Sequence, residues 1–137
     1  MYTEVKNQLA AKWQIDLNEY WIPLSLKEFP EIGVNHYKLN VFKREFGLET
    51  LNQLINAWET KSVYEFIQFG EENKSETLTI SIRAGEDVFY TNQYADWVIY
   101  ITHKGTITIA GKALLEQIKE QWPNWTDFQN SFFKKLN

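Results

Sequence analysis

The periodicity of apolar residues changes twice along this chain, and these changes constrain the fold more than any other feature. Between residues 62 and 110, apolar and polar side chains alternate with a period of two, which predicts half-buried β-strands. Before and after this region, apolar residues recur every three or four positions, which predicts amphipathic helices. Helices on both sides of a run of strands favour an α+β fold built on one antiparallel sheet.

The helical pattern is clearest at the two ends of the chain and just before the strands. Helices are predicted over residues 3–14, 50–58, 111–122 and 126–136. Capping-box spacing supports two of them, because Thr50 is followed by Gln53, and Thr126 by Gln129. The segment 16–30 is expected to be irregular.

Residues 36–46 fit two patterns. The alternation that begins at Tyr37 is typical of a strand, whereas the spacing of the later apolar residues fits a helix equally well. Asn35 before the segment and Gly47 after it are natural helix caps. These caps favour a helix, and a strand is the alternative.

Five stretches in the alternating region are candidate strands. They cover residues 62–69, 78–84, 88–91, 97–102 and 106–110, with turns at 71–75, 85–87 and 103–105. The stretch 78–84 has the cleanest alternation of the five. The sequence therefore predicts an antiparallel meander of four or five strands, with N-terminal and C-terminal helices packed on one face.

Length and composition narrow the class of protein further. A chain of 137 residues without a linker or repeat is the size of a single domain, residues 1–137. The absence of cysteine excludes thiol nucleophiles, disulfides and cysteine-based metal sites. The longest stretch without a charged residue, residues 50–58, is too short to cross a membrane, and the N-terminus carries no signal-peptide pattern. We therefore expect a cytoplasmic protein, and the abundance of Lys, Asn, Ile and Glu suggests a bacterial source.

The charge is distributed unevenly along the chain. Its net value is −4, but residues 45–96 carry ten acidic and only three basic side chains. Nucleic-acid-binding proteins present a basic field, so the sequence argues against such a partner. An acidic middle region instead favours a basic partner.

No pattern of catalytic or metal-ligating residues is present. The six glycines are scattered singly, so no phosphate-binding loop can be recognised. The two histidines, His36 and His103, are far apart in sequence and are most simply a helix or loop residue and a turn residue. We expect no cofactor and no metal, assign no catalytic residue, and consider an enzyme the less favoured class.

Acidic and aromatic residues are the remaining signal for a binding surface, because exposed Tyr and Trp beside carboxylates resemble a protein-binding site. The candidate partner-binding residues are Glu71, Glu72, Glu76, Glu86, Asp87, Tyr90, Tyr94 and Asp96. In a meander, consecutive turns lie at opposite ends of the sheet, so the clusters at 71–76 and 86–87 are not expected to form one patch. The simpler interpretation is core aromatics with ordinary surface charge.

Three functions follow from these observations. The favoured one is a non-enzymatic protein-binding module, in its most concrete form an immunity-type protein that neutralises a basic partner such as a toxin. The alternative is a small-molecule-binding or enzymatic domain with a pocket between sheet and helices, near Arg83, Trp97 and His103. A third possibility is an accessory subunit of a larger assembly. The sequence does not determine the oligomeric state.

Overall fold

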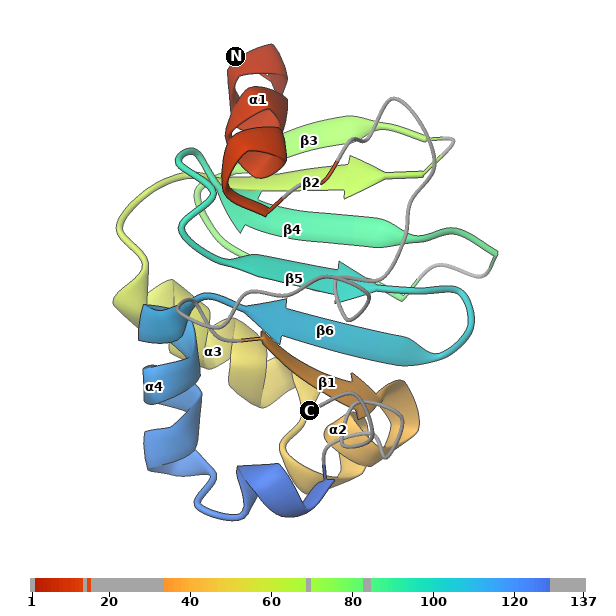
Figure 1. The fold of residues 1–137 in the computed structure, drawn as a ribbon, viewed down its shortest axis with the longest axis vertical. Helices are drawn as coiled ribbons and strands as arrows, with labels where there is room; N and C mark the ends of the chain where they lie inside the picture. Colours follow the sequence, from red (N-terminus) through yellow and green to blue (C-terminus); the bar gives the residue numbers. More distant parts are fainter. Residues whose placement is uncertain (1, 14, 16–33, 69, 83–84, 129–137) are drawn as a thin grey trace.

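The computed structural model describes residues 2–13, 15, 34–68, 70–82 and 85–128 (Figure 1). Its helices are α1 (Tyr2–Trp13), α2 (Leu39–Glu45), α3 (Leu48–Trp58), α4 (Lys112–Gln121) and the short 3-10 helix η2 (Trp125–Phe128). Its strands are β1 (Val34–Lys38), β2 (Val63–Ile67), β3 (Glu72–Ser75), β4 (Val88–Asn92), β5 (Val98–Ile101) and β6 (Thr106–Ala110). Within these residues, no helix is long and apolar enough to cross a membrane.

The strands form one antiparallel sheet in the order β1-β6-β5-β4-β2-β3 (Figure 1). Strands β4, β5 and β6 follow one another as a meander, as predicted. Strand β2, however, pairs with both β3 and β4, so β3 and β4 lie on either side of it. The chain must therefore cross β2 between the end of β3 and the start of β4.

Helices cover both faces of the sheet. Helix α1 packs on the face that carries Val98 and Tyr100. Helices α2, α3 and α4 pack on the opposite face, which carries Ile99 and Ile101. The α+β class, the antiparallel sheet and the helices near both ends are confirmed. The structure corrects one part of the prediction, because the N-terminal and C-terminal helices lie on different faces of the sheet. A strand such as β5, in which every residue is apolar, buries both of its faces and therefore needs helices on each side of the sheet.

The ambiguous segment 36–46 contains both of the predicted structures in succession. Its first residues belong to β1, which pairs with β6 so that Tyr37 lies opposite Ile107. Helix α2 begins at Leu39, whose backbone N–H donates to the carbonyl oxygen of Gly105 at 2.8 Å. The helix prediction was wrong for residues 36–38, because these residues pair with strand β6, about 70 positions later in the sequence.

The segment with the cleanest alternation, 78–84, is described only as far as residue 82, and residues 78–82 are not a strand of the sheet. Leu78 and Ile80 are buried as predicted, but their backbone groups bond to side chains of α3 instead of a neighbouring strand. The Asn56 side chain accepts from the Leu78 N–H at 2.6 Å and donates to its carbonyl at 2.9 Å, and Asn52 accepts from the Ile80 N–H at 3.1 Å. The predicted turn at 71–75 instead contains the edge strand β3.

The predicted helices at 3–14, 50–58 and 111–122 correspond to α1, α3 and α4. In α1 the buried residues Val5, Leu9 and Trp13 form one stripe, as the helical spacing predicts. In α3, Leu51, Leu54 and Ile55 are buried as predicted, but Asn52 is buried as well and Trp58 is only half-buried. The last predicted helix, 126–136, is described only as far as the short turn η2, and its remainder lies outside the described residues. The segment 16–30 also lies outside them.

Burial of His36 in β1 predicts a dependence of stability on pH. Its side chain is buried, Nδ1 lies 2.9 Å from the Thr108 hydroxyl oxygen, and burial lowers the pKa of His36 from 6.5 to about 4. The unfolded chain therefore binds more protons than the folded chain between these values, so stability rises with pH across that window. The free energy of unfolding from urea titrations should fall by about 2 kcal/mol between about pH 7 and about pH 5.

The control for this prediction is His36→Gln, which removes the titrating group. Its stability should change much less than that of the wild type across the same pH interval, because the substitution removes only the His36 imidazole. An unchanged pH dependence in the variant would contradict the assignment to His36.

Candidate functional site

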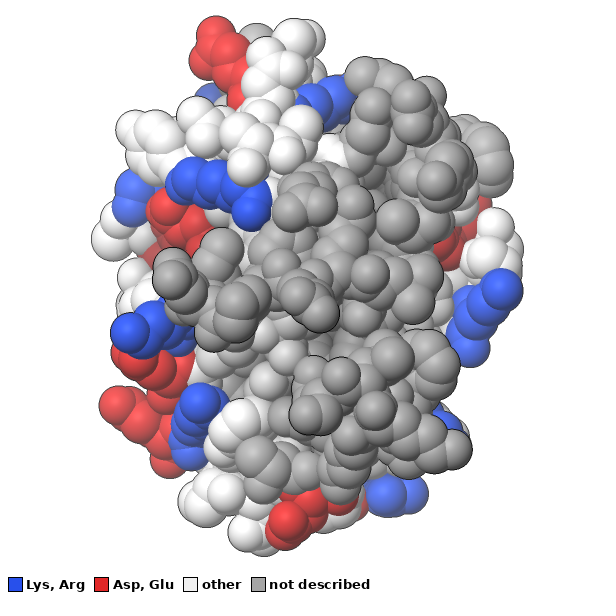
Figure 2. Space-filling view, viewed as in Figure 1, with Lys and Arg blue, Asp and Glu red and all other residues white. Residues whose placement is uncertain are grey.

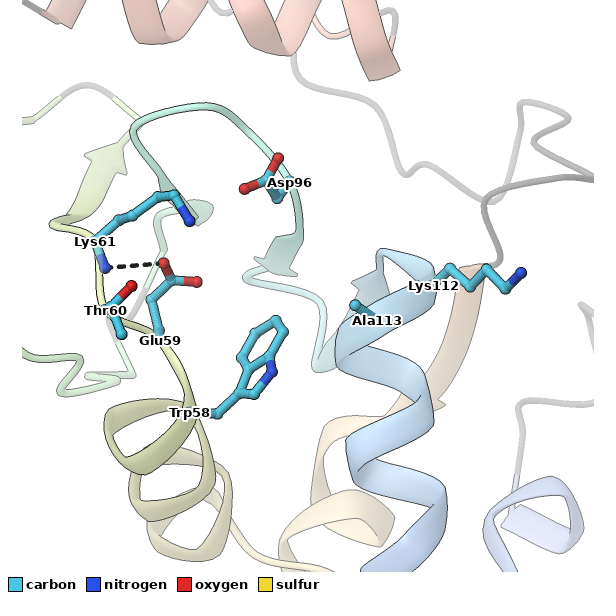
Figure 3. A pocket seen from close by; sticks show the side chains of 7 residues that line it. All are labelled: Trp58, Glu59, Thr60, Lys61, Asp96, Lys112 and Ala113. Atoms are coloured by element: carbon cyan, nitrogen blue, oxygen red, sulfur yellow. Dashed lines mark hydrogen bonds between the residues drawn. The ribbon is translucent and has the colours of Figure 1, made fainter.

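A hollow of about 510 Å³ lies at the end of the sheet where β4 turns into β5. Its walls come from the end of α3 and the residues after it, from the β4–β5 turn, and from the first turn of α4 (Figure 3). The lining residues are Trp58, Glu59, Thr60, Lys61, Asp96, Lys112 and Ala113. In Figure 3 the Trp58 ring lies between α3 and α4, Lys61 and Asp96 point towards each other, and Lys112 points away.

The Glu59 carboxylate connects three parts of this site. Glu59 follows the last residue of α3, and its backbone N–H donates to the carbonyl oxygen of Ile55 at 2.7 Å. Its Oε2 accepts from the Trp97 indole N–H at 2.8 Å, and its Oε1 accepts from the Lys61 backbone N–H at 3.0 Å. Because Trp97 is fully buried, this carboxylate satisfies the indole and fixes the end of α3 against the start of β5.

The side-chain amide of Asn92 brings two carboxylates together. Its Nδ2 donates to Glu59 Oε2 at 3.3 Å and to Asp96 Oδ2 at 2.9 Å. Its Oδ1 accepts from the backbone N–H groups of Tyr94 and Asp96, each at 3.0 Å. Asn92 is completely buried, so this one amide determines both the shape of the turn and the spacing of the two acids.

Asp96 remains ionised because its neighbours stabilise the charged form. Burial alone would raise the pKa of its carboxyl, but hydrogen bonds from Asn92 and Lys12 and the charges of Lys12 and Lys61 outweigh it. Together they hold the pKa of Asp96 below its ordinary value. Lys12 Nζ of α1 lies 3.3 Å from Asp96 Oδ1, with both side chains substantially exposed.

The turn between β4 and β5 contains a backbone conformation that is unusual for its residue. Ala95 has φ of 54°, in the left-handed region that favours glycine. The Trp13 indole N–H donates to the Ala95 carbonyl at 2.8 Å, and Lys12 Nζ donates to the Tyr94 carbonyl at 2.7 Å. These bonds hold a turn from which Tyr94 projects, 46% exposed, with Lys61 Nζ 5.7 Å from the centre of its ring.

Three of the predicted acidic residues gather at the opposite end of the sheet. The chain reverses at Gly70 between β2 and β3, immediately before Glu71 and Glu72. A β-carbon on Gly70 would lie 3.7 Å from Glu86 Oε2. The expectation that the two acidic clusters lie at opposite ends is therefore wrong, because the segment before Glu86 crosses the sheet instead of adding a strand to it.

The other candidate binding residues at this end have internal roles. Asp87 and Tyr90 are buried, with 5% and 1% of their surface exposed, so neither presents a surface to a partner. Asp87 Oδ1 accepts from the His103 backbone N–H at 2.9 Å and lies 2.7 Å from His103 Nδ1, while Oδ2 accepts from the Tyr100 hydroxyl. The Tyr90 hydroxyl accepts from the Ser81 backbone N–H at 3.0 Å.

The predicted residues are thus divided between several places. Glu71, Glu72 and Glu86 lie at one end of the sheet, and Tyr94 and Asp96 lie at the other. Glu76 follows the far end of β3, beyond Ser75, away from the first group.

The residues proposed for a ligand pocket do not share one site. Trp97 is buried at the start of β5, whereas His103 is in the turn after β5, at the opposite end of the sheet. Arg83 lies outside the described residues.

Sequence reasoning did not select Trp58, Glu59 or Asn92 for this site. Trp58 and Glu59 occur at the end of a predicted helix, where an aromatic residue and an acid are unremarkable. Asn92 lies one residue beyond the predicted strand 88–91, and in the structure it is the last residue of β4, in which every residue is buried.

The described residues contain no candidate metal centre, and no relative of the chain is found. Within the described part of the chain, no group of three or more His, Cys, Asp or Glu side chains could hold a metal ion. Comparison with protein-family models, curated proteins and solved structures finds no match to this chain. The site is therefore interpreted from its own geometry.

Proposed function

We propose that this chain is a non-enzymatic protein-binding module, of the immunity type that neutralises a basic partner such as a toxin. It binds through the β4–β5 turn and the hollow beside it. The observation that supports this is the Ala95 turn, where a non-glycine residue in the left-handed region presents an exposed tyrosine next to a hollow of about 510 Å³. Such conformations persist where the surrounding structure fixes them, and they concentrate at functional sites.

Two aromatic side chains would anchor the partner. Tyr94 is one of the two exposed large hydrophobic side chains of the described residues, and Trp58 is half-buried in the wall of the hollow. Tyr and Trp are over-represented among residues that carry most of the binding energy at protein interfaces. Because hydrogen bonds already hold the turn in place, little ordering of the chain would be required on binding.

The polar groups of the hollow suit a basic side chain. The carboxylates of Glu59 and Asp96 converge on the Asn92 amide, and α3 ends beside them, with the negative end of its dipole at the site. Lys12 and Lys61 surround Asp96 in the free protein, and Figure 2 shows positive and negative side chains intermixed along the edge that holds α4. An exposed ion pair contributes little stability, so a lysine or arginine of the partner can replace them at small cost.

A binding role also fits the way the acids are used. The Glu59 carboxylate accepts from the Lys61 backbone N–H and the Trp97 indole, and the Asp96 carboxylate accepts from the Asn92 amide, so both acids hold the turn and the end of α3 in place. The Asp87–His103 pair, which is the arrangement most similar to an acid–base pair, lies at the other end of the sheet from the hollow. The hollow and this pair therefore do not form one reaction site.

The test is capture of partners from a lysate of the native host with the tagged protein, washed at low and at high salt. A basic protein should be recovered in stoichiometric amount at low salt and lost at high salt, because salt screens exposed charges. Tyr94→Ala should weaken its binding about tenfold or more, and Asp96→Asn should weaken it less while reducing the salt dependence.

Glu71→Ala is the matched control, because it removes an exposed carboxylate at the opposite end of the sheet. It should leave recovery unchanged. If Glu71→Ala reduces recovery while Tyr94→Ala and Asp96→Asn do not, the partner binds the other acidic cluster and the proposed surface is incorrect. If no protein is recovered at either salt, the binding-module proposal fails.

A second candidate is a small-molecule site in the same hollow, because a volume of about 510 Å³ lies within the range of ligand pockets. This candidate predicts that a compound carrying an amine raises the melting temperature of the wild type. It also predicts that Trp58→Ala abolishes that increase while Tyr94→Ala preserves it. The protein-binding proposal predicts no such ligand.

A further inference from the structure

Strand β3 forms one edge of the sheet, and its outer side carries backbone groups that pair with none of the described residues. The Ile67 N–H donates to the Glu71 carbonyl, and Glu65 lies opposite Asn73, so the alternate residues 71, 73 and 75 direct their backbone groups at β2. The backbone groups of Glu72 and Lys74 therefore point outward. No strand among the described residues pairs with that side, where β3 is the last of the sheet (Figure 1).

We propose that β3 pairs antiparallel with β3 of a second copy of this chain, with Asn73 opposite Asn73 across a twofold axis. In this register Glu72 lies opposite Lys74 of the second copy, and Lys74 lies opposite its Glu72. Both outward-facing residues of each strand then exchange N–H···O=C bonds with the other copy. The two sheets become one continuous sheet, and the interface is the same patch on both copies.

The charges select this register over its neighbours. Glu72 and Lys74 are two residues apart, so their side chains lie on the same face of the sheet. A shift by two residues in either direction would place Glu72 opposite Glu72 or Lys74 opposite Lys74 at the axis, and like charges directly opposite are destabilising. Only the proposed register places opposite charges in both of the hydrogen-bonded pairs.

Contacts within the chain are compatible with this arrangement. Lys6 of α1 lies 2.7 Å from the Glu72 carboxylate and so holds that side chain on the α1 face. Asn73 donates to Glu65 at 2.9 Å on the other face, which fixes the strand that would be extended. Because β3 has only four residues, the contact is smaller than a standard protein interface and the dimer should be reversible.

Sedimentation velocity of the full chain over a range of concentrations tests this proposal. The wild type should show a monomer–dimer equilibrium at concentrations of about 10 μM to about 1 mM. Lys74→Glu places two Glu–Glu pairs across the axis and should weaken dimerisation about tenfold or more. Glu72→Lys should do the same, and the double variant Glu72→Lys with Lys74→Glu should restore the dimer, because it exchanges the charges and keeps them complementary.

A second variant tests the backbone bonds without changing the pairing of β3 with β2. Lys74→Pro removes the outward N–H of residue 74 together with the lysine charge, and proline is tolerated at a strand edge, so the folded monomer should remain and the dimer should be lost. Lys74→Ala removes the charge alone and should retain more of the dimer. Circular dichroism confirms the fold of each variant. A wild type that stays monomeric throughout the range, or a dimer that survives Lys74→Pro and both single charge reversals, would overturn the proposal.

Discussion

The Gly111→Ala variant is expected to lose about 4 kcal/mol of unfolding free energy, from backbone strain and crowding together. Gly111 precedes α4 with φ of 120°, a conformation that side chains rarely adopt. A β-carbon there would lie 2.9 Å from the Asp96 carbonyl oxygen and 2.9 Å from the α-carbon of Trp97. Both contacts are with the backbone, which cannot rotate away as a flexible side chain can. Urea denaturation at neutral pH measures the loss.

Gly105→Ala is the matched control for this result. Gly105 also has a positive φ, of 82°, but a β-carbon there would meet nothing within 4 Å. Its loss should therefore be only the strain of the left-handed conformation, about 1 kcal/mol. The difference between the two variants isolates crowding against the β4–β5 turn, and equal losses would contradict that interpretation. Gly111→Ala should also disturb the Tyr94 surface, whereas Gly105→Ala should not.

The Asp87→Ala variant is expected to lose about 3 kcal/mol of unfolding free energy, because it removes the acceptor of several hydrogen bonds in a buried place. Asp87 is 5% exposed and accepts from the Tyr100 hydroxyl and from the backbone N–H of His103. Burial and the adjacent Asp87 carboxylate raise the pKa of Tyr100, so its hydroxyl stays protonated and donates. The variant would remove the Asp87 carboxylate from that buried hydroxyl and from the His103 backbone N–H.

Tyr100→Phe separates the contributions of this network. It removes the hydroxyl but leaves Asp87 with both bonds to His103, so its loss should be about 1 to 2 kcal/mol. The double variant should lose less than the sum of the single losses, because both changes remove the same bond. If the losses simply add, the two residues are not coupled in the way that the geometry indicates.

The sequence predicted those helices and strands whose pattern of buried residues does not depend on which element packs against them. The stripes of α1, α3 and α4 were visible because each helix buries one face whatever lies against it. Strands β5 and β6 were visible because short runs rich in β-branched and aromatic residues between turn residues are typical of strands. The stretch that begins at Leu78 was misassigned as a strand. Leu78 and Ile80 are buried as the alternation predicts, whereas Ile82 is 49% exposed. Periodicity reports burial, and here the groups that satisfy the backbone are amides of Asn52 and Asn56 on a helix. Nothing in the sequence of that stretch indicates whether its backbone will bond to side chains of a helix or to a neighbouring strand.

The candidate site was predicted only in part for a similar reason. Tyr94 and Asp96 could be selected because an aromatic and an acid close together in a turn are informative by themselves. Trp58 and Glu59 come from the end of a helix more than thirty positions earlier in the sequence. Glu59 joins them through its hydrogen bonds with the buried Asn92 amide and the Trp97 indole. The gathering of Glu71 and Glu86 depended equally on the path of the chain across β2, which local sequence does not encode.

The place of β1 at the far edge of the sheet has a consequence for the order of folding. Its first pair joins Val34 to Ala110, so this ladder closes a much longer loop than the hairpin between β5 and β6. The entropy lost on closing a loop grows with its length and must be lost before the pairing stabilises the chain. Strands β4 to β6 can therefore assemble early through short turns, while β1 is added late. His36 would then leave water only in the last stage of folding, and an acidic solution would slow that stage more than the earlier ones.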